Sequence, residues 1–437
     1  MRFIADFHIH SKYSRAVSKD MVLEELDRWA DDKGILVMGT GDFTHPEWFK
    51  ELKEKLEPAE LGLFRLKPEF KRKTIKGTLA ETRFMLTVEI SGIYTRGGRG
   101  RRIHNLVFVP DFETAENINT QLSWIGNLKS DGRPILGIDS EELARIVFSS
   151  HQEAAVIPAH VWTPWFSLFG SMSGFDRIEE CFGKFAPEIF AIETGLSSDP
   201  SMNWRLSTLD RIALISNSDS HSLERIGREA NVFDAELSYR GIMDALKSFN
   251  PKRFVATIEF FPEEGKYHYD GHRACNVSWH PDETRRNAGI CTGCKKKVTV
   301  GVMSRVGALA DRPVPKATRV SLGAMEGITW NGRTPYVNLV PLDEIIGEAI
   351  GVGAQSKAVR VEYEKLIQAF GSELGVLMEH PIEAIAQVAK PEVALALGRV
   401  RLGKLSIEPG YDGEYGKVRI FREESDRKAI EVQRSLF

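Results

Sequence analysis

The sequence predicts an α/β catalytic domain, built as a barrel or a doubly wound sheet, followed by a small metal-binding module and a mainly helical C-terminal domain. From residue 1 to about residue 260, short apolar runs alternate with amphipathic helical stretches, which is the rhythm of α/β folds. Residues 265–320 break this rhythm with clustered His, Cys, Lys and Arg. From Tyr336 onward, apolar residues recur at helical spacing. The expected parts are a catalytic domain (1–260), a basic zinc-binding module (261–320), a C-terminal domain (321–421) and a flexible tail (422–437).

Eight apolar runs of the first part have the length and composition of strands. They are Arg2–Ile9, Ile35–Gly41, Arg83–Ile90, Asn105–Pro110, Ala155–Pro158, Phe190–Thr194, Ala213–Ser218 and Arg253–Glu259. Between the first two, Ser18 can cap a helix whose apolar positions include Leu26 and Trp29. In the C-terminal domain, Leu342–Ile350 and Val359–Leu374 have the spacing of helices.

Composition favours a cytoplasmic protein. The chain has 437 residues, 42% of them hydrophobic and 27% charged, and no apolar stretch approaches the roughly 18 residues of a membrane helix. It opens on the strand-like run Met1–Phe7 instead of a signal peptide. We therefore expect no membrane partner. Three of the four cysteines fall within twenty residues, which in a cytoplasmic chain indicates metal binding before disulfides.

A pair of histidines ends the first predicted strand. His8 and His10 are separated by one residue, so both imidazoles point to the same side of the strand. Taken alone, the pair fits a solvated strand edge as well as the beginning of a metal site.

Ligand-type residues recur at the ends of nearly all the following strands. They are Asp42 and His45 after the second strand, Glu89 in the third, His160 after the fifth, Glu193 in the sixth, and Asp219 and His221 after the seventh. In a barrel of parallel strands these ends form one face, so the residues should converge there. A structural metal site or a set of hydrogen-bonded core histidines is the weaker interpretation, because a structural zinc takes four ligands and this face offers more.

His104 is the exception, because it begins a strand. It follows Glu89 by fifteen residues, across the segment Gly92–Arg102. We expect that these two strands form an antiparallel hairpin or that His104 lies in the loop itself. Either arrangement brings His104 back to the metal face.

The chemistry of these ligands points to hydrolysis. Imidazoles and carboxylates without a thiolate suit two or three divalent ions such as Zn, Mn, Mg or Fe. Such ions acidify a water that attacks phosphorus and stabilise charge on the attacking and leaving oxygens. We expect Glu89, Asp219 and His221 to be catalytic, with Asp219 or His221 positioning the nucleophile.

The motifs, in this order, resemble those of the PHP superfamily of phosphoesterases over the first 230 to 260 residues. The resemblance implies a distorted TIM-like (β/α)7 barrel with a trinuclear metal site. The implied ligands are His8, His10, Glu89 and Asp219 for one ion, Glu89, His104 and His160 for a second, and His45 and His221 for a third. The chain departs from the family at Lys12–Ser14, where many members have a further histidine, and in the spacing of Asp42 and His45.

The cysteines outline a second metal site. Cys275 and the pair Cys291 and Cys294 have the spacing of two zinc knuckles, which predicts one tetrahedral structural zinc. The fourth ligand is His272, His268 or His280. Between residues 265 and 319, eleven Lys and Arg face four Asp and Glu, a surplus that suits a phosphate backbone.

The segments Gly265–Cys275, Ala310–Pro313 and Pro409–Gly416 resemble the zinc module and C-terminal domain of the endonuclease Q family. The resemblance then extends over nearly all residues up to about 421. It implies a DNA repair endonuclease that cuts 5′ to deaminated bases (uracil, hypoxanthine, xanthine) and abasic sites and leaves a 3′-hydroxyl and a 5′-phosphate. It also implies nucleoid association and a C-terminal domain that recognises DNA or the lesion, with the damaged base extruded into a pocket.

Three segments are candidates for DNA contacts: an arginine-rich segment, an aromatic loop and the lysine run Lys295–Lys297. The arginine-rich segment Arg96–Arg102 is expected to lie above the metal face and bind phosphates. An exposed, solvated loop is an equal alternative. An aromatic loop follows His160 and can stack on bases, or it can belong to a lid or the core. The DNA-binding candidates are Arg99, Arg101, Arg102, Trp165, Lys295, Lys296 and Lys297.

The chain ends in Gln433-Arg-Ser-Leu-Phe437 after a charged stretch. Gln433, Leu436 and Phe437 resemble the peptide by which bacterial proteins dock on the replicative sliding clamp, although Arg434 stands where Leu is common. A tail that folds back on the protein is an equal alternative.

Two other functions compete with the repair endonuclease. A PHP-type phosphatase of small phosphate esters explains the first 260 residues but gives the basic zinc module no purpose. A catalytically inactive protein that binds DNA or the clamp is disfavoured, because nearly all metal positions carry competent ligands.

Overall fold

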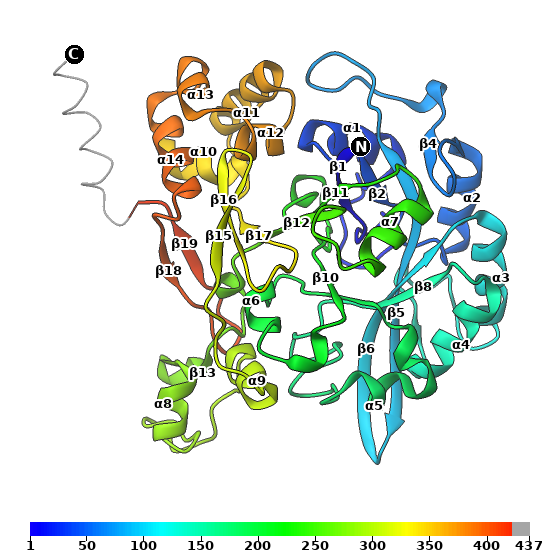
Figure 1. Ribbon diagram of the computed structural model, residues 1–437, viewed down its shortest axis with the longest axis vertical. Coiled ribbons are helices and arrows are strands. Elements are labelled where there is room, and N and C mark those ends of the chain that lie inside the picture. Colours follow the sequence, from blue (N-terminus) through cyan, green and yellow to red (C-terminus); the bar gives the residue numbers. More distant parts are fainter. Residues whose placement is uncertain (422–437) are drawn as a thin grey trace.

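The structure is a computed structural model that describes residues 1–421. It is a mixed α/β fold with one large sheet and helices around it (Figure 1). The predicted tail and its clamp-binding residues Gln433, Leu436 and Phe437 lie outside the described residues. Over the described range, no helix is long and apolar enough to cross a membrane.

The large sheet has 13 strands in the order β15-β16-β17-β12-β11-β1-β2-β5-β4-β3, with β6 and β7 attached to β5, and β8 to β6. Its strands are β1 (Arg2–Asp6), β2 (Val37–Gly39), β3 (Leu56–Pro58), β4 (Phe64–Leu66), β5 (Arg83–Arg96), β6 (Arg99–Val109), β7 (Ile135–Leu136), β8 (Ala155–Pro158), β11 (Ala230–Asp234), β12 (Phe254–Glu259), β15 (Thr318–Leu322), β16 (Met325–Thr329) and β17 (Tyr336–Asn338). Three separate pairs are β9 (Ala191–Glu193) with β10 (Ala213–Ile215), β13 (Asp270–His272) with β14 (Val277–Trp279), and β18 (Ser406–Glu408) with β19 (Lys417–Arg419).

The helices of the catalytic part are α1 (Leu23–Lys33), α2 (Pro46–Lys55), α3 (Phe112–Ser123), α4 (Ser140–Ser150), α5 (Ile178–Phe182), α6 (Pro200–Asn203) and α7 (Tyr239–Lys247). The remaining helices are α8 (Pro281–Arg286), α9 (Val302–Leu309), α10 (Leu342–Ile350), α11 (Lys357–Phe370), α12 (Glu373–Met378), α13 (Ile382–Val388) and α14 (Pro391–Arg401). Short 3-10 turns lie at Pro68–Phe70, Gly183–Glu188, Ser207–Leu209, Leu223–Arg225, Pro262–Glu264 and Arg273–Cys275.

Strand direction explains where the site forms. β1, β2 and β5 are parallel neighbours, and β6 is antiparallel to both β5 and β8, so β8 runs in the same direction as β5. β9 and β10 are parallel to each other, and a parallel bridge between Ile9 and Ser220 joins the end of β10 to the end of β1. The carboxyl ends of these strands therefore meet at one face.

The side chains that the strands turn inward form a compact core beneath that face. Phe7 packs edge-on against Phe108, with ring centroids 5.7 Å apart, and also lies next to Phe233. All three rings are fully buried. Small residues such as Ala5 and Ala191 fill the same core, which lets the strands close around it.

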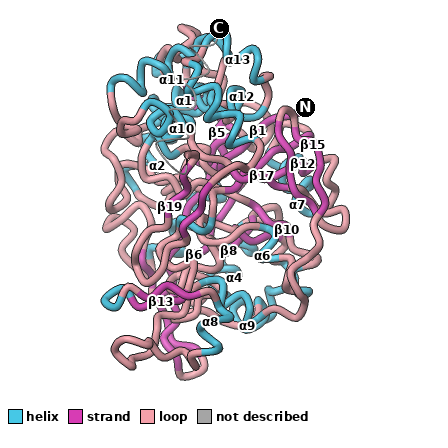
Figure 2. Tube along the Cα trace, turned by 90° about the vertical axis from the view of Figure 1, so that its left-hand side faces the viewer, coloured by secondary structure: helices cyan, strands magenta, loops and turns pink. Residues whose placement is uncertain are grey.

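All eight predicted runs contain a strand, and β11 is a further strand that was not predicted. The predicted boundary at residue 320 falls within β15, and β17 pairs with β12 in the large sheet. Residues 318–338 therefore extend this sheet, and the helices α10–α14 follow. The views in Figures 1 and 2 agree that α8, α9 and β13 lie at one end of the molecule and α10–α13 at the other.

Candidate active site

Two overlapping groups of metal-ligating side chains share Glu89. In the first group, one ligand atom from each of His8, His10, Glu89 and Asp219 lies within 4.8 Å of the others. Glu89, His104 and His160 form the second group by the same criterion. These are the two ligand sets that the PHP resemblance implies.

The backbone brings the ligands of both groups to the strand ends. His104 lies on β6 opposite Ser91 on β5, so the expected antiparallel hairpin is confirmed. His160 follows β8 and Asp219 follows β10, and both have left-handed backbones, with φ of 29° and 47°. Such conformations are costly for residues other than glycine and cluster at functional sites.

The first group has the donors of a cation site. His8 Nε2 lies 3.7 Å from Glu89 Oε2 and 3.5 Å from Asp219 Oδ1. His10 Nε2 lies 3.4 Å and 3.1 Å from the same two oxygens. His8 Nε2 is buried and has no hydrogen-bond partner among the described residues. Because buried polar atoms rarely lack a partner, this nitrogen fits a metal ligand.

The second group converges on the other oxygen of Glu89. Glu89 Oε1 lies 2.6 Å from His104 Nδ1 and 3.0 Å from His160 Nε2, and these two nitrogens are 3.2 Å apart. Burial lowers the pKa of His104 to about 4. The imidazole is therefore neutral at pH 7, the form that binds a metal ion.

Asp42 and Glu193 lie behind the histidines, outside both groups. Glu193 Oε1 and Oε2 lie 3.0 Å and 3.1 Å from His8 Nδ1, and Oε2 accepts a hydrogen bond from the backbone N–H of His160. Asp42 Oδ1 lies 3.2 Å from His10 Nδ1. The sequence suggested two ligands, whereas the structure gives both carboxylates the position that fixes a ligating imidazole's tautomer and orientation.

His45 and His221, expected at a third ion, also lie outside these groups. The His45 ring stacks on Tyr13, with centroids 4.3 Å apart. The His221 ring lies 4.7 Å from that of His10, and its Nδ1 is 2.8 Å from the carbonyl oxygen of Asp219. Within residues 1–421, this face gathers two ligand groups and not a third.

Arg133 belongs to the site, although no pattern in the sequence indicates it. Its Nη1 donates a 3.1 Å hydrogen bond to Glu89 Oε2, and its side chain is 25% exposed. Arg133 precedes the short strand β7 in a loop without periodicity. A residue in such a loop has no fixed sequence distance from Glu89, so the sequence alone could not identify Arg133 as part of the site.

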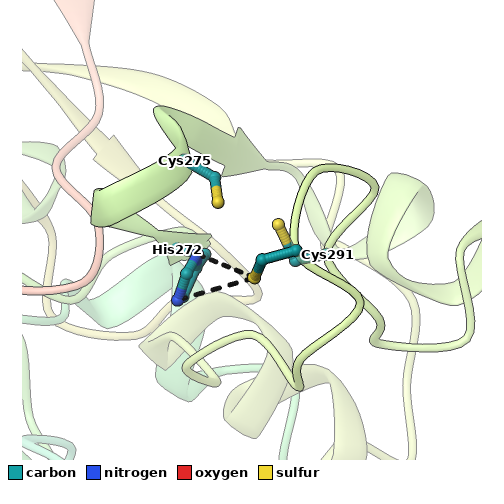
Figure 3. A group of neighbouring side chains, drawn as sticks. His272, Cys275 and Cys291 are labelled. Carbon is teal, nitrogen blue, oxygen red and sulfur yellow. Dashed lines mark hydrogen bonds between the residues drawn. The ribbon is translucent and has the colours of Figure 1, made fainter.

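The cysteine module forms its own ligand group. One ligand atom from each of His272, Cys275, Cys291 and Cys294 lies within 4.8 Å of the others, and Figure 3 shows the first three side chains converging. His272 Nδ1 is 3.5 Å from Cys294 Sγ. Backbone N–H groups, chiefly that of Cys294, lower the pKa of the Cys291 thiol to about 7, which favours the thiolate that binds zinc.

The three candidates for the fourth zinc ligand are thereby separated. His272 lies in the group, whereas His280 Nδ1 accepts a hydrogen bond from the backbone of Asp282 at the start of α8. His268 is buried and stacks on Tyr269.

The expected arginine-rich loop is instead the tip of a hairpin. β5 and β6 continue to Arg96 and Arg99 and turn at two glycines with positive φ, and Figure 1 shows this long hairpin projecting from the sheet. Arg101 packs over the Phe175 ring, 4.0 Å from its centroid. Arg102 alternates to the same side of β6 as His104. Of the three arginine candidates, Arg102 therefore points toward the metal face.

Arg102 also takes part in an aromatic contact with the site. Its guanidinium lies 5.5 Å from the Phe166 ring, which in turn lies 4.8 Å from the His104 ring. The neighbouring Trp165 is partly buried, and its ring centroid lies 5.6 Å from that of Tyr267. The lysine candidates Lys295, Lys296 and Lys297 are all exposed.

Several known proteins are similar to this chain. Residues 341–404 match the family of the MJ0043 C-terminal domain. The chain is 33% identical over 263 residues to protein MJ0043 of Methanocaldococcus jannaschii, covering 59% of this chain and 31% of that protein. It is 29% identical over 434 residues to YqxK of Bacillus subtilis, covering 96% of this chain and 99% of YqxK. The chain thus spans about a third of the first relative and almost all of the second.

Two solved structures match nearly the whole chain. The lesion-specific endonuclease PfuEndoQ of Pyrococcus furiosus is 32% identical with a TM-score of 0.81, over 97% of this chain and 96% of that one. An endonuclease Q complex with a 27-mer duplex carrying an abasic lesion at the active site is 32% identical with a TM-score of 0.80, over 97% of each chain. This chain belongs to the endonuclease Q family of DNA-cleaving hydrolases.

Proposed function

We propose that this protein is a DNA repair endonuclease that hydrolyses the phosphodiester bond 5′ to deaminated bases and abasic sites. The observation that carries the proposal is the pair of ligand groups sharing Glu89, in a chain that matches endonuclease Q bound to an abasic lesion over 97% of its length. Ions held in these groups would activate a water and neutralise charge at the phosphate.

The side chains of the site support this chemistry in distinct ways. Glu193 and Asp42 hold the imidazoles of His8 and His10 from behind. Burial lowers the pKa of His221 below its usual 6.5, so its imidazole is a neutral base at pH 7. With Nδ1 engaged at the Asp219 carbonyl, Nε2 remains to exchange a proton with the substrate.

The proposed scaffold is a distorted PHP-type barrel over residues 1–260. In support, β1, β2, β5, β6 and β8 form one continuous ladder, and the bridge between Ile9 and Ser220 ties the β9–β10 pair back to β1. We also propose one structural zinc in the module of residues 261–320, and DNA or lesion recognition by residues 321–421.

The proposed DNA path runs from the metal face toward the zinc module. Phe166 lies against His104, and the next ring, Trp165, contacts Tyr267 of the module. Beyond it, Lys266 Nζ lies 4.5 Å from the Tyr415 ring, which is 70% exposed. Rings alternating with cations suit stacked bases and phosphates of an opened strand. The exposed lysines 295–297 extend the positive surface.

Docking on a sliding clamp through Gln433, Leu436 and Phe437, and nucleoid association, stay predictions. Deleting residues 433–437 should abolish capture of this protein by an immobilised bacterial clamp while leaving lesion cleavage intact. Equal capture of the full and shortened chains would exclude the predicted peptide.

The test is cleavage of end-labelled duplexes that carry one deoxyuridine, deoxyinosine or abasic site, with undamaged DNA alongside. Wild-type protein with Mg²⁺ or Mn²⁺ should give one cut 5′ to the lesion, and Asp219→Asn should give none. Asp234→Asn is the matched control, because the Asp234 side chain is 57% exposed and pairs with the N-terminus away from the ligands. Release of phosphate from p-nitrophenyl phosphate without DNA cleavage would favour the phosphatase instead.

A further inference from the structure

The loop that carries Arg133 is fastened to the metal face. Asp131 Oδ1 accepts hydrogen bonds from the backbone N–H groups of Arg15 and Arg133, both at 3.2 Å. The N–H of Gly132 donates to the carbonyl of Tyr13. A Cβ added to Gly132 would lie 2.2 Å from Asp42 Oδ2, so only glycine lets the loop approach the carboxylate that orients His10. Arg133 is thus held at the site by its backbone.

The Arg133 side chain spans from the buried ligands to the surface. Its Nη1 donates to Glu89 Oε2, and Glu89 is fully buried, whereas the Arg133 side chain is 25% exposed. A guanidinium has five N–H donors in a planar fork. Among the described residues, Glu89 is the acceptor that this fork meets, so donors remain for a ligand that approaches from solvent.

The charge of Arg133 indicates what that ligand is. A guanidinium beside a group that would bind divalent cations is repelled by them, because like charges a few ångströms apart repel strongly where water is partly excluded. The Glu89 carboxylate offsets part of this repulsion, and an anionic ligand bound at the remaining donors of Arg133 would offset more of it. Phosphate oxygens match the guanidinium fork, which can bind two of them at once.

We propose that Arg133 is a catalytic residue that donates to a non-bridging oxygen of the scissile phosphodiester. The proposal rests on the function proposed above and names the group that holds the reacting phosphate. The alternative is a structural role, in which Arg133 only neutralises Glu89 and keeps the ligands in place. The two roles differ in what is lost on substitution: phosphate binding and turnover in the first, metal content and stability in the second.

The experiment compares wild type with Arg133→Gln, Arg133→Ala and Arg15→Gln. Arg15 is the matched control, because it contacts Asp131 of the same loop while its side chain is 73% exposed. For Arg133→Gln we expect kcat on lesion DNA to fall about 100-fold, the cost of one donor to transition-state charge. Bound metal by mass spectrometry and melting temperature should stay near those of wild type. Guanidinium ion should restore part of the rate of Arg133→Ala.

A second measurement does not depend on cleavage. Inorganic phosphate titrated into the metal-loaded proteins by calorimetry should bind Arg133→Gln at least tenfold more weakly than wild type or Arg15→Gln. Unchanged phosphate affinity and kcat, or a loss of rate that follows a loss of metal, would overturn the assignment. If wild type does not cut lesion DNA, the proposed function fails, while the phosphate titration still decides the role of Arg133.

Discussion

Replacing Glu193 should weaken metal binding although no ligand is removed. The carboxylate holds His8 Nδ1 with both oxygens, at 3.0 Å and 3.1 Å, and turns His8 Nε2 toward Glu89 and Asp219. It also accepts hydrogen bonds from Asn217 and from the backbone of His160. Glu193 therefore fixes residues of both ligand groups.

The size of the effect follows from what each substitution leaves behind. Glu193→Gln keeps an oxygen for His8 Nδ1 but loses the negative charge, so we expect about tenfold weaker binding. Glu193→Ala loses the acceptor as well and should cost about 100-fold. These factors correspond to about 1.4 and 2.7 kcal/mol.

The assay is competition of each metal-free protein with a chromophoric chelator for Mn²⁺, because the thiolate group of the zinc module disfavours this ion. Glu188→Gln is the matched control, since Glu188 is exposed just before β9. Melting temperatures must show that the variants are folded. Wild-type Mn²⁺ affinity in Glu193→Ala, or an equal loss in Glu188→Gln, would refute the reasoning.

Three further predictions address the fold. Cys291→Ser should lower the zinc content by one ion per chain in mass spectrometry, whereas His280→Ala should not; equal loss in both would reopen the ligand assignment. Lys33 and Glu373 form a 2.6 Å ion pair whose side chains are 4% and 5% exposed, so Lys33→Met should cost about 3–5 kcal/mol in urea unfolding. Adding Glu373→Leu should recover only part of this cost, because the Leu342 N–H and the Tyr363 hydroxyl then lose their acceptor. Burial raises the pKa of Glu259 to about 8, against 4.5 when unfolded, so the folded state binds more protons between these values. The free energy of unfolding should then fall as pH rises from 5 to 8, by at most about 1.4 kcal/mol per unit for this group, and Glu259→Gln should flatten the dependence; an unchanged slope would contradict it.

Geometry that follows from strand periodicity was predictable. His8 and His10 share one side of the chain because strand side chains alternate, and Glu89, His160 and Asp219 meet because parallel strands end at the same face. These rules need only the order and type of the elements, which apolar runs reveal. The β5–β6 hairpin that returns His104 to the site is one of the two arrangements expected from the sequence.

The roles of the carboxylates were not predictable in this way. Asp42 follows an apolar run as Asp219 does, and Glu193 lies near the end of one as Glu89 does. Yet Asp42 and Glu193 reach the Nδ1 atoms of His10 and His8 instead of the space between the ligands. Which side of an imidazole a carboxylate meets depends on differences of a few ångströms in strand position. Residue type and spacing do not encode such differences.

The position of Arg133 was likewise not predictable from residue type and spacing. Its place depends on a loop that Asp131 and Gly132 hold against the ligands, and such contacts have no period along the chain. Asp42 and Glu193 lie behind the imidazoles, and the Arg133 guanidinium lies on the open side of Glu89. One part of the face can therefore hold ions, and the other can bind an anion. Such a division supports the proposed phosphodiesterase, because a site that only stored metal ions would gain nothing from a cation placed to meet an anionic ligand.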